Sequence, residues 1–151
     1  MSHLLSASGC VFCEILAGRA PGSIVHRDDQ TCALMDILPV NPGHVLVIPV
    51  SHAAFLAELD PEAGADLFRV GQRIAAEFRR SDLRCEGVNL LLADGEAAGQ
   101  EVFHVHLHVI PRYRGDGSGF RFGARGASPP TRSALDEIAE KLRTSLERGR
   151  C

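Results

Sequence analysis

The chain has 151 residues, of which 45% are hydrophobic and 23% are charged, and its formal net charge is -3. This composition predicts one globular domain, and the lack of a basic surplus argues against a nucleic-acid partner. No apolar run approaches the roughly 18 residues that a membrane-spanning helix needs, and residues 1–9 lack the basic start and apolar stretch of a signal peptide. We therefore expect a cytoplasmic protein that binds neither nucleic acid nor membrane.

The first third of the chain predicts one short helix and three strands. Residues 10–16 carry apolar side chains at helical spacing, and Gly18 can end that helix. Residues 23–26 and 31–36 have the pattern of two strands joined across a polar turn, which predicts a hairpin. Residues 44–50 follow a loop with proline and glycine and form a strongly apolar strand.

The middle of the chain predicts the main helix and two more strands. Asp60 is an N-cap residue and Pro61 suits the first helical position. One side of this helix is apolar at steps of three and four residues, at Leu67, Val70, Ile74 and Phe78. Residues 87–93 and 103–111 are the next strands. Hairpins with one long helix, instead of strictly alternating strands and helices, favour an α+β fold with a mostly antiparallel sheet.

The last forty residues predict a connection and a helix. Residues 112–130 are rich in glycine and proline and predict a long, irregular connection. Ser133 can cap a final helix whose inward side chains are Leu135, Ile138, Leu142 and Leu146.

Cysteine usage points to a metal site. Five cysteines in a chain without an export signal argue against a disulfide framework. Cys10 and Cys13 form a Cys-x-x-Cys pair, which is typical of half a metal site or of a redox motif, and no strand precedes it to suggest a thioredoxin-like arrangement. The alternative is a pair of small buried residues under the first helix. Cys32 and Cys85 have the setting of core or loop residues, and Cys151 is a tail thiol.

Three histidines alternate with apolar residues in the strand expected at 103–111. A strand places every second side chain on one face, so His104, His106 and His108 should form a row with members about 6.5 Å apart. A ligand of phosphate or nucleotide size can then contact two of them. A structural role, in which each ring has ordinary polar partners, and a metal site are the alternatives. Spacing alone does not separate a nucleophile from a ligand.

These residues carry a family resemblance. The run from Gly99 to Arg112, GQEVFHVHLHVIPR, resembles the signature of the histidine triad superfamily of nucleotide hydrolases and transferases. The likeness extends to the stretches CVFCEILAG from Cys10 and MDILPVNPGHVLVIP from Met35, and to His52. It covers about residues 10–122. Residues 1–9 are then a flexible N-terminus, and residues 123–151 are a C-terminal extension with a loop and a helix.

The resemblance implies a fold, an assembly and a metal. The fold would be a five-stranded antiparallel sheet with one long and one C-terminal helix, joined across a two-fold axis into a homodimer with a continuous ten-stranded sheet. By resemblance to zinc-containing members, a structural zinc ion would be held by Cys10, Cys13, His52 and His104, a closed Cys2His2 set of the kind found in structural sites.

The resemblance also implies roles at the site. His106 would attack the α-phosphate of a purine nucleotide conjugate and form a nucleotidyl-histidine, His108 would donate to a non-bridging oxygen, and His44 would support the row. Gln100 is counted with these catalytic residues because its loop would supply backbone N–H groups to the phosphate. The implied nucleotide contacts are Phe12, Ile15, Asp36, Ile37, Asp94, Gly99, Gln100, Glu101, His106 and His108.

Two positions depart from the family pattern. Ala93 stands where many relatives have an Asn or Gln that contacts ribose or phosphate, and neighbouring Asp94 is the candidate to replace it. Glu101 stands where eukaryotic relatives have a Ser or Thr that contacts the leaving group, so preference between a phosphoramidate and a dinucleoside polyphosphate stays open. The competing functions are a zinc-stabilised nucleotide-binding module with little turnover and a zinc hydrolase that uses the histidines as ligands.

Overall fold

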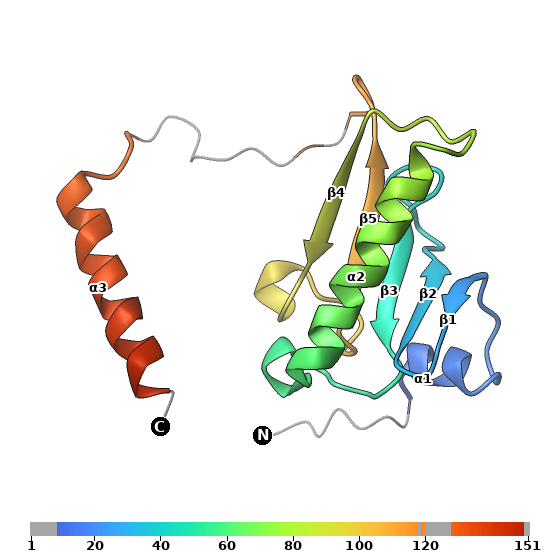
Figure 1. Ribbon diagram of the computed structural model, residues 1–151, viewed down its shortest axis with the longest axis horizontal. Coiled ribbons are helices and arrows are strands. Elements are labelled where there is room, and N and C mark those ends of the chain that lie inside the picture. Colours follow the sequence, from blue (N-terminus) through green and yellow to red (C-terminus); the bar gives the residue numbers. More distant parts are fainter. Residues whose placement is uncertain (1–8, 118, 120–127, 150–151) are drawn as a thin grey trace. The chain divides into compact units, whose positions relative to one another are not determined.

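The computed structural model describes residues 9–117, 119 and 128–149. These belong to two compact units, one that ends at residue 118 and one that begins at residue 119. The first unit contains the sheet and the helices α1 and α2, and the second contains α3 (Figure 1). Most of residues 1–9, and residues 118 and 120–127 of the expected connection, lie outside the described part of the chain.

Among the described residues, five strands form one antiparallel sheet in the order β1-β2-β3-β5-β4. The α+β fold and its sheet are therefore confirmed. β1, β2 and β3 pair in chain order, and β5 lies between β3 and β4. The strands are β1 (Ile24–Arg27), β2 (Thr31–Met35), β3 (Val45–Pro49), β4 (Gly87–Leu92) and β5 (Leu107–Arg112).

The long helix α2 (Pro61–Phe78) covers one face of the sheet (Figure 1). Asp60 caps it, as its sequence predicts, by accepting hydrogen bonds from the N–H groups of Glu62 and Ala63. The apolar side of α2 packs on β3 and β5 in a core that includes Leu67, Val70, Ile74, Val47 and Val109. None of the described helices is long and apolar enough to span a membrane.

The short helix α1 (Val11–Leu16) packs on the other face. Its buried Phe12 belongs to a second cluster with Leu34, Leu46 and Ile48. Neighbouring residues of a strand point to opposite faces, and His108 is paired with Leu46 in the register of β5 and β3. His108 therefore lies on the α1 face of the sheet, opposite α2.

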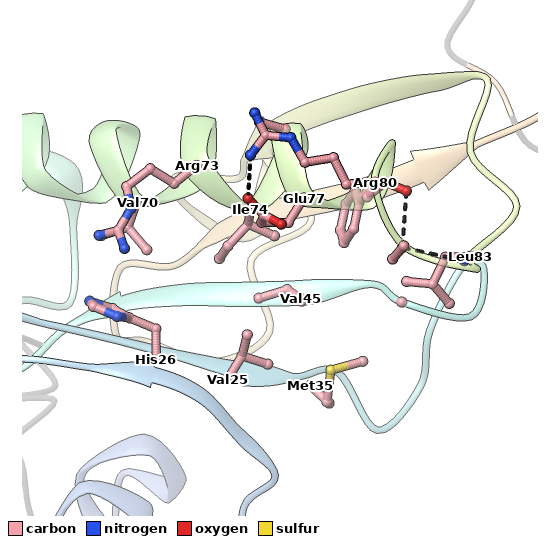
Figure 2. Close-up of a pocket in the computed structure, with 14 residues that line it drawn as sticks. Val25, His26, Met35, Val45, Val70, Arg73, Ile74, Glu77, Arg80 and Leu83 are labelled. Atoms are coloured by element: carbon pink, nitrogen blue, oxygen red, sulfur yellow. Dashed lines mark hydrogen bonds and ion pairs between the residues drawn. The ribbon is translucent and has the colours of Figure 1, made fainter.

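A cavity of about 750 Å³ lies on the α2 face (Figure 2). It is lined by apolar side chains of α2 and the sheet, among them Val25, Met35, Val45 and Ile74. Because Val45 and Leu46 point to opposite faces of β3, the sheet separates this cavity from His108.

The strand with the histidines begins later than expected. β5 starts at Leu107, whereas the alternating pattern predicts a strand from residue 103. Two interactions explain the difference. The N–H of Val105 donates to the carbonyl of Ala53 in a loop, at 2.8 Å, and the ring of His104 is drawn into a buried cluster with other side chains. His104 and His106 therefore belong to the loop that enters β5.

The last helix also differs from its prediction. α3 (Arg132–Arg148) is capped by the Thr131 side chain, which accepts from the N–H of Ala134, and Ser133 lies inside the helix. The expected cap was therefore wrong by two residues. The side chains expected to face inward are 41–67% exposed in this structure: Leu135, Ile138, Leu142 and Leu146. α3 has no buried residue.

Candidate active site and zinc centre

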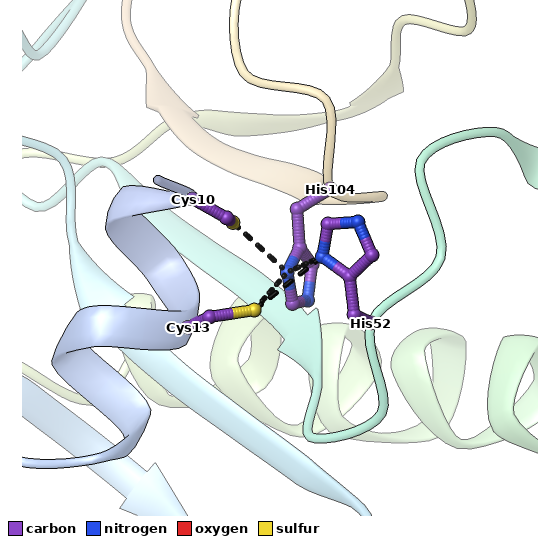
Figure 3. A group of neighbouring side chains, drawn as sticks. All are labelled: Cys10, Cys13, His52 and His104. Carbon is purple, nitrogen blue, oxygen red and sulfur yellow. Dashed lines mark hydrogen bonds between the residues drawn. The ribbon is translucent and has the colours of Figure 1, made fainter. Parts of the chain in front are cut away.

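Four side chains from three segments converge on the α1 side of the sheet (Figure 3). Cys10 and Cys13 come from the start of α1, His52 from the loop after β3, and His104 from the loop before β5. Their ligand atoms lie within 4.8 Å of one another. The Nδ1 atoms of the two histidines are 3.3 Å apart, and the contacts between sulfur and nitrogen are 3.4–3.6 Å.

This geometry fits a tetrahedral zinc ion. Bonds of about 2.3 Å to sulfur and 2.0–2.1 Å to nitrogen put neighbouring ligands roughly 3.3–3.8 Å apart around a tetrahedron. The Nε2–H of His104 donates to the carbonyl of Pro49 at 2.9 Å, which leaves the lone pair of Nδ1 directed at the cluster. His104 is completely buried, and this burial lowers its pKa to about 4, so the ring is a neutral ligand at pH 7.

The histidine row is preserved although it starts in a loop. The ring of Phe12 packs edge-on against both His104 and His106, at centroid distances of 5.7 and 5.4 Å. The rings of His106 and His108 follow at 4.9 Å. All three rings therefore lie on the α1 side, but they have different surroundings, because His104 is turned into the metal cluster.

A hydrogen bond selects the free nitrogen of His106. Its Nδ1 lies 2.8 Å from the carbonyl oxygen of His104. A carbonyl only accepts, so Nδ1 carries the proton and Nε2 keeps its lone pair. Nε2 is then the unprotonated nitrogen of a ring that is itself buried, with 6% of its surface exposed.

A second chain of hydrogen bonds orients His108. The backbone N–H of Val40 donates to Nδ1 of His44 at 3.1 Å, so neutral His44 carries its proton on Nε2. That proton is donated to Nδ1 of His108 at 2.9 Å. His108 must then carry its own proton on Nε2. No residue pattern pointed to Val40, because its contribution is a backbone N–H, which every residue except proline has.

The lowered pKa values of His44 and His108 preserve this series of hydrogen bonds. Burial, together with the neighbouring rings of His106 and His44, lowers the pKa of His108 to about 4, and the charge of Asp36 opposes this shift. Burial also lowers the pKa of His44. Both rings are therefore neutral at pH 7, and each has one N–H with which it can donate a hydrogen bond.

Asp36 lies directly after β2 and faces this pair. Its Oδ2 atom is 3.5 Å from Nε2 of His44 and 3.9 Å from Nδ1 of His108. Its Oδ1 atom accepts from the N–H of Leu38 at 2.8 Å. Next to it, Ile37 and Leu38 are 91% and 81% exposed, an unusual exposure for apolar side chains beside a cluster of histidines.

A polar network that we did not anticipate holds the turn before His44. The buried Asn41 side chain donates to the carbonyl of Pro111 at 2.9 Å and to Asp116 at 2.8 Å. Asp116 is also bound by both Nε and NH2 of Arg112, at 2.6 and 2.7 Å. The carbonyl of Asn41 accepts from the N–H of His44. The signal in the sequence was an Asn three residues before a histidine, at the start of a Pro-Gly turn.

The loop after β4 is built around Gln100. Its Nε2 donates to the carbonyls of Ala54 and Val102, and its Oε1 accepts from Gly95 N–H. The N–H of Gly99 donates to the carbonyl of Glu96 in the turn η2 (Glu96–Ala98), and the N–H of Gln100 donates to the carbonyl of Gly95, directly before that turn. In this structure these two N–H groups therefore have acceptors within their own loop, and the expected role of the loop toward a phosphate stays a prediction.

The remaining expected contacts are spread around this loop and α1. Asp94 accepts from the N–H of Leu56 in the turn η1 (Leu56–Glu58) at 2.8 Å, and Ala93 is buried. Glu101 is exposed, and Ile15 packs against the second cluster beside Phe12.

Comparisons with known proteins identify the family. A family model described as the HIT domain matches residues 17–115. The chain belongs to the HIT family. An uncharacterized HIT-like protein of Mycobacterium tuberculosis is 42% identical over 129 residues, which are 85% of this chain and 89% of that protein. The protein hit of Bacillus subtilis is 42% identical over 75% of this chain and 78% of its own length.

Solved HIT structures share the fold. A Zn-bound histidine triad family protein of Mycobacterium smegmatis is 38% identical, with a TM-score of 0.72, over 95% of this chain and 99% of that one. A histidine triad nucleotide-binding protein of Candida albicans is 29% identical, with a TM-score of 0.79, over 93% and 99%. The Zn-bound relative and the Cys2His2 cluster of this HIT protein together support a structural zinc site in this chain.

Proposed function

We propose that this HIT protein hydrolyses or transfers at the α-phosphate of a purine nucleotide conjugate, a nucleoside phosphoramidate or a dinucleoside polyphosphate, through a nucleotide bound covalently to His106. The observation that carries the proposal is the protonation of two ring nitrogens, Nε2 of His106 and Nε2 of His108, which follows from their hydrogen bonds. Nε2 of His106 has a lone pair, and Nε2 of His108 has a proton. A nucleophile and a hydrogen-bond donor thus stand on adjacent rings.

The reaction would have two displacements. In the first, Nε2 of His106 forms a bond to the α-phosphorus, and the bond from phosphorus to the leaving group breaks, with the electron pair going to the leaving group, which takes up a proton. In the second, water attacks phosphorus, gives up a proton, and the bond to His106 breaks. A covalent intermediate divides one difficult displacement into two easier ones.

His108 would stabilise the charge that develops on the phosphoryl oxygens. Its Nε2–H is fixed in direction by His44 and Val40, so it needs no reorganisation as the charge forms. Asp36 Oδ2 would accept hydrogen bonds from the ribose hydroxyls. The exposed Ile37 would form one wall of the site for the base, and Phe12 and Ile15 would form the other. Asp94 and Glu101 would act toward phosphate and leaving group, and Gln100 would act by holding their loop.

The zinc-hydrolase alternative is disfavoured by the same hydrogen bonds. Asp36, His44 and His108 have ligand atoms within 4.8 Å of one another, as a metal site needs. A metal at Nε2 of His44 would move that proton to Nδ1, where it would oppose the Val40 N–H that now donates there. A histidine that binds a metal through one ring nitrogen usually donates the N–H of its other nitrogen to an acceptor, as His104 does to the carbonyl of Pro49.

A rapid acid quench tests the covalent step. The enzyme is mixed with α-labelled adenosine phosphoramidate, and with α-labelled diadenosine polyphosphate side by side, and quenched within one turnover. We expect label on the protein, and peptide mapping should place it on His106. Label on His104 or His108 would overturn the assignment. Binding of nucleotide without label or product would favour the alternative of a nucleotide-binding module.

Variants of adjacent histidines provide the matched control. His106→Ala removes the covalent path and should abolish turnover, whereas His108→Ala removes one donor and should lower kcat by about 10²–10³. His106→Gly with added imidazole should recover part of the activity, because the small nucleophile fits the vacated space. Near wild-type turnover in His106→Ala would contradict the proposal.

A further inference from the structure

The cavity on the α2 face takes no part in the proposed reaction, because the sheet separates it from His108. Its volume is about 750 Å³. Sites for small molecules have volumes of roughly 300–1,000 Å³ and are mostly apolar, with a few polar groups that orient the ligand. The size of this cavity is therefore that of a site for a second molecule.

An irregularity in β1 shapes one wall of the cavity. The register of β1 and β2 shifts between Ile24 and His26, which leaves Val25 as the extra residue. Neighbouring residues of a regular strand point to opposite faces, yet Val25 and His26 both line the cavity. Bulges of this kind often redirect a side chain beside a functional site. Val25 is directed to the cavity although it is apolar and 49% exposed.

The other walls are apolar along the length of the cavity (Figure 2). α2 contributes Val70, Ile74 and Phe78, and the sheet contributes Met35 and Val45. From Val70 to Phe78 the helix rises about 12 Å. The cavity therefore suits a ligand whose apolar body has about this length.

The charged groups that line the cavity leave one positive charge without a partner. Glu77 and Arg80 form an ion pair with each other at 2.8 Å. His26 is hydrogen-bonded to Asp28 at 2.9 Å. Arg73 also lines the cavity, and within the described part of the chain its side chain has neither a hydrogen bond nor an ion pair. Figure 2 shows Arg73 at the same end of the cavity as His26.

We propose that this cavity binds an amphipathic monoanion, a small molecule with an apolar body and one carboxylate. Arg73 binds the carboxylate, because a guanidinium matches its two oxygens with two parallel hydrogen bonds. The apolar body lies between α2 and the sheet, against Ile74 and Val25, and extends toward Phe78. A cationic ligand of the same shape meets the charge of Arg73 and is disfavoured.

A titration of the whole protein with decanoate, followed by NMR of the backbone amides, tests the site. We expect shifts at Val25, Val70 and Ile74 that saturate with a Kd of about 0.1–1 mM, as is reasonable for a ligand of this size. Decanol and decylamine have the same apolar body and should bind several-fold more weakly. Equal affinity for the three compounds would overturn the proposal. Shifts confined to α3 or to the catalytic rings would also overturn it.

Two arginines on α2 provide matched variants. Arg73→Gln should weaken decanoate binding about three- to fivefold, the effect of one exposed ion pair, and should leave decanol binding unchanged. Arg69 lies one turn earlier and is paired with Asp66 at 2.6 Å, so Arg69→Gln should bind decanoate as the wild type does. An equal loss in both variants would show a general attraction to a basic helix and would contradict a site at Arg73.

A variant that fills the cavity tests where the apolar body lies. Val25→Trp should abolish decanoate binding, because the larger side chain occupies the space, and the exposure of Val25 leaves room for it. An unchanged melting temperature and zinc content would show that the variant is folded; if it is not, the two arginine variants decide the proposal. His106→Ala should bind decanoate normally. Wild-type affinity in folded Val25→Trp, or loss of binding in His106→Ala, would overturn the proposal.

Discussion

At the scale of single residues, the site depends on which ring nitrogen holds a proton. The carbonyl of His104 and the N–H of Val40 make that choice for His106 and His44. Neither group is a side chain. Two backbone atoms therefore determine the direction of both catalytic nitrogens in the proposed reaction.

The lowered pKa of His108 predicts how stability depends on pH. Its pKa falls from 6.5 to about 4 on folding, because burial penalises the charged ring. The unfolded chain thus binds more protons between these values, and stability should fall as the pH drops from 6.5 toward 4, by about 3 kcal/mol for this group. Urea titrations at pH 7, 6 and 5 measure the slope. His108→Gln should show a smaller slope than wild type, and an unchanged slope would contradict this origin.

The turn at Asn41 gives a prediction about turnover. Asn41→Ala removes the bonds to Pro111 and Asp116 and loosens the turn that supplies the Val40 N–H. We expect kcat to fall about tenfold with little change in KM, because the looser turn costs the Val40 hydrogen bond to His44, and a tenfold change corresponds to about one hydrogen bond. The measurement is steady-state kinetics well below the melting temperature, with a pH profile to follow the titration of His108.

A neighbouring residue of the same network is the control for Asn41. Asn89 lies on β4 and accepts from NH1 of Arg112 at 2.6 Å, whereas Asn41 bonds to Pro111 and Asp116. Asn89→Ala should lower stability without lowering kcat. A similar loss of kcat in both variants would indicate a general structural effect instead of positioning.

At the scale of elements, the zinc cluster joins three segments that are far apart in the sequence. It links α1 to the loops that leave β3 and enter β5. α1 has six residues and no side-chain cap, so it depends on such an attachment. The cluster also fixes the carbonyl of His104, the acceptor for His106.

Loss of one zinc ligand should destabilise the protein more than it slows turnover. Cys13→Ala should lose the metal and lower the melting temperature by about 5 °C or more, since each kcal/mol corresponds to about 2–4 °C in a chain of this size. Some turnover should remain, because Cys13 does not contact His106 or His108 in the proposed reaction. Elemental analysis and thermal melts measure both effects. Cys85→Ala lies outside the cluster and should keep its zinc, and a wild-type protein without metal would refute the prediction.

At the scale of the whole molecule, the described sheet has two edges, β1 and β4. Unpaired edges invite association. We expect a homodimer in which edge strands pair into a continuous ten-stranded sheet, as the family resemblance implies. Light scattering at micromolar concentration should give twice the chain mass of 16.3 kDa. A mass of one chain would count against the dimer.

The sequence by itself determined the local features of this protein. Period-two and helical patterns located every strand and α2 to within a few residues, and Asp60 with Pro61 marked the start of α2. The Cys-x-x-Cys pair indicated half of a metal site. These features depend on residues close together in the chain, where backbone geometry limits the arrangements.

Only the tertiary structure decided the partners across the chain. His44 and His108 are 64 residues apart, and the register of β3 and β5 brings them to 2.9 Å. The late start of β5 likewise follows from the hydrogen bond between Val105 and Ala53 in another loop. Which nitrogen of each histidine is free depends on backbone groups that have the same chemistry in almost every residue, so no residue type records it.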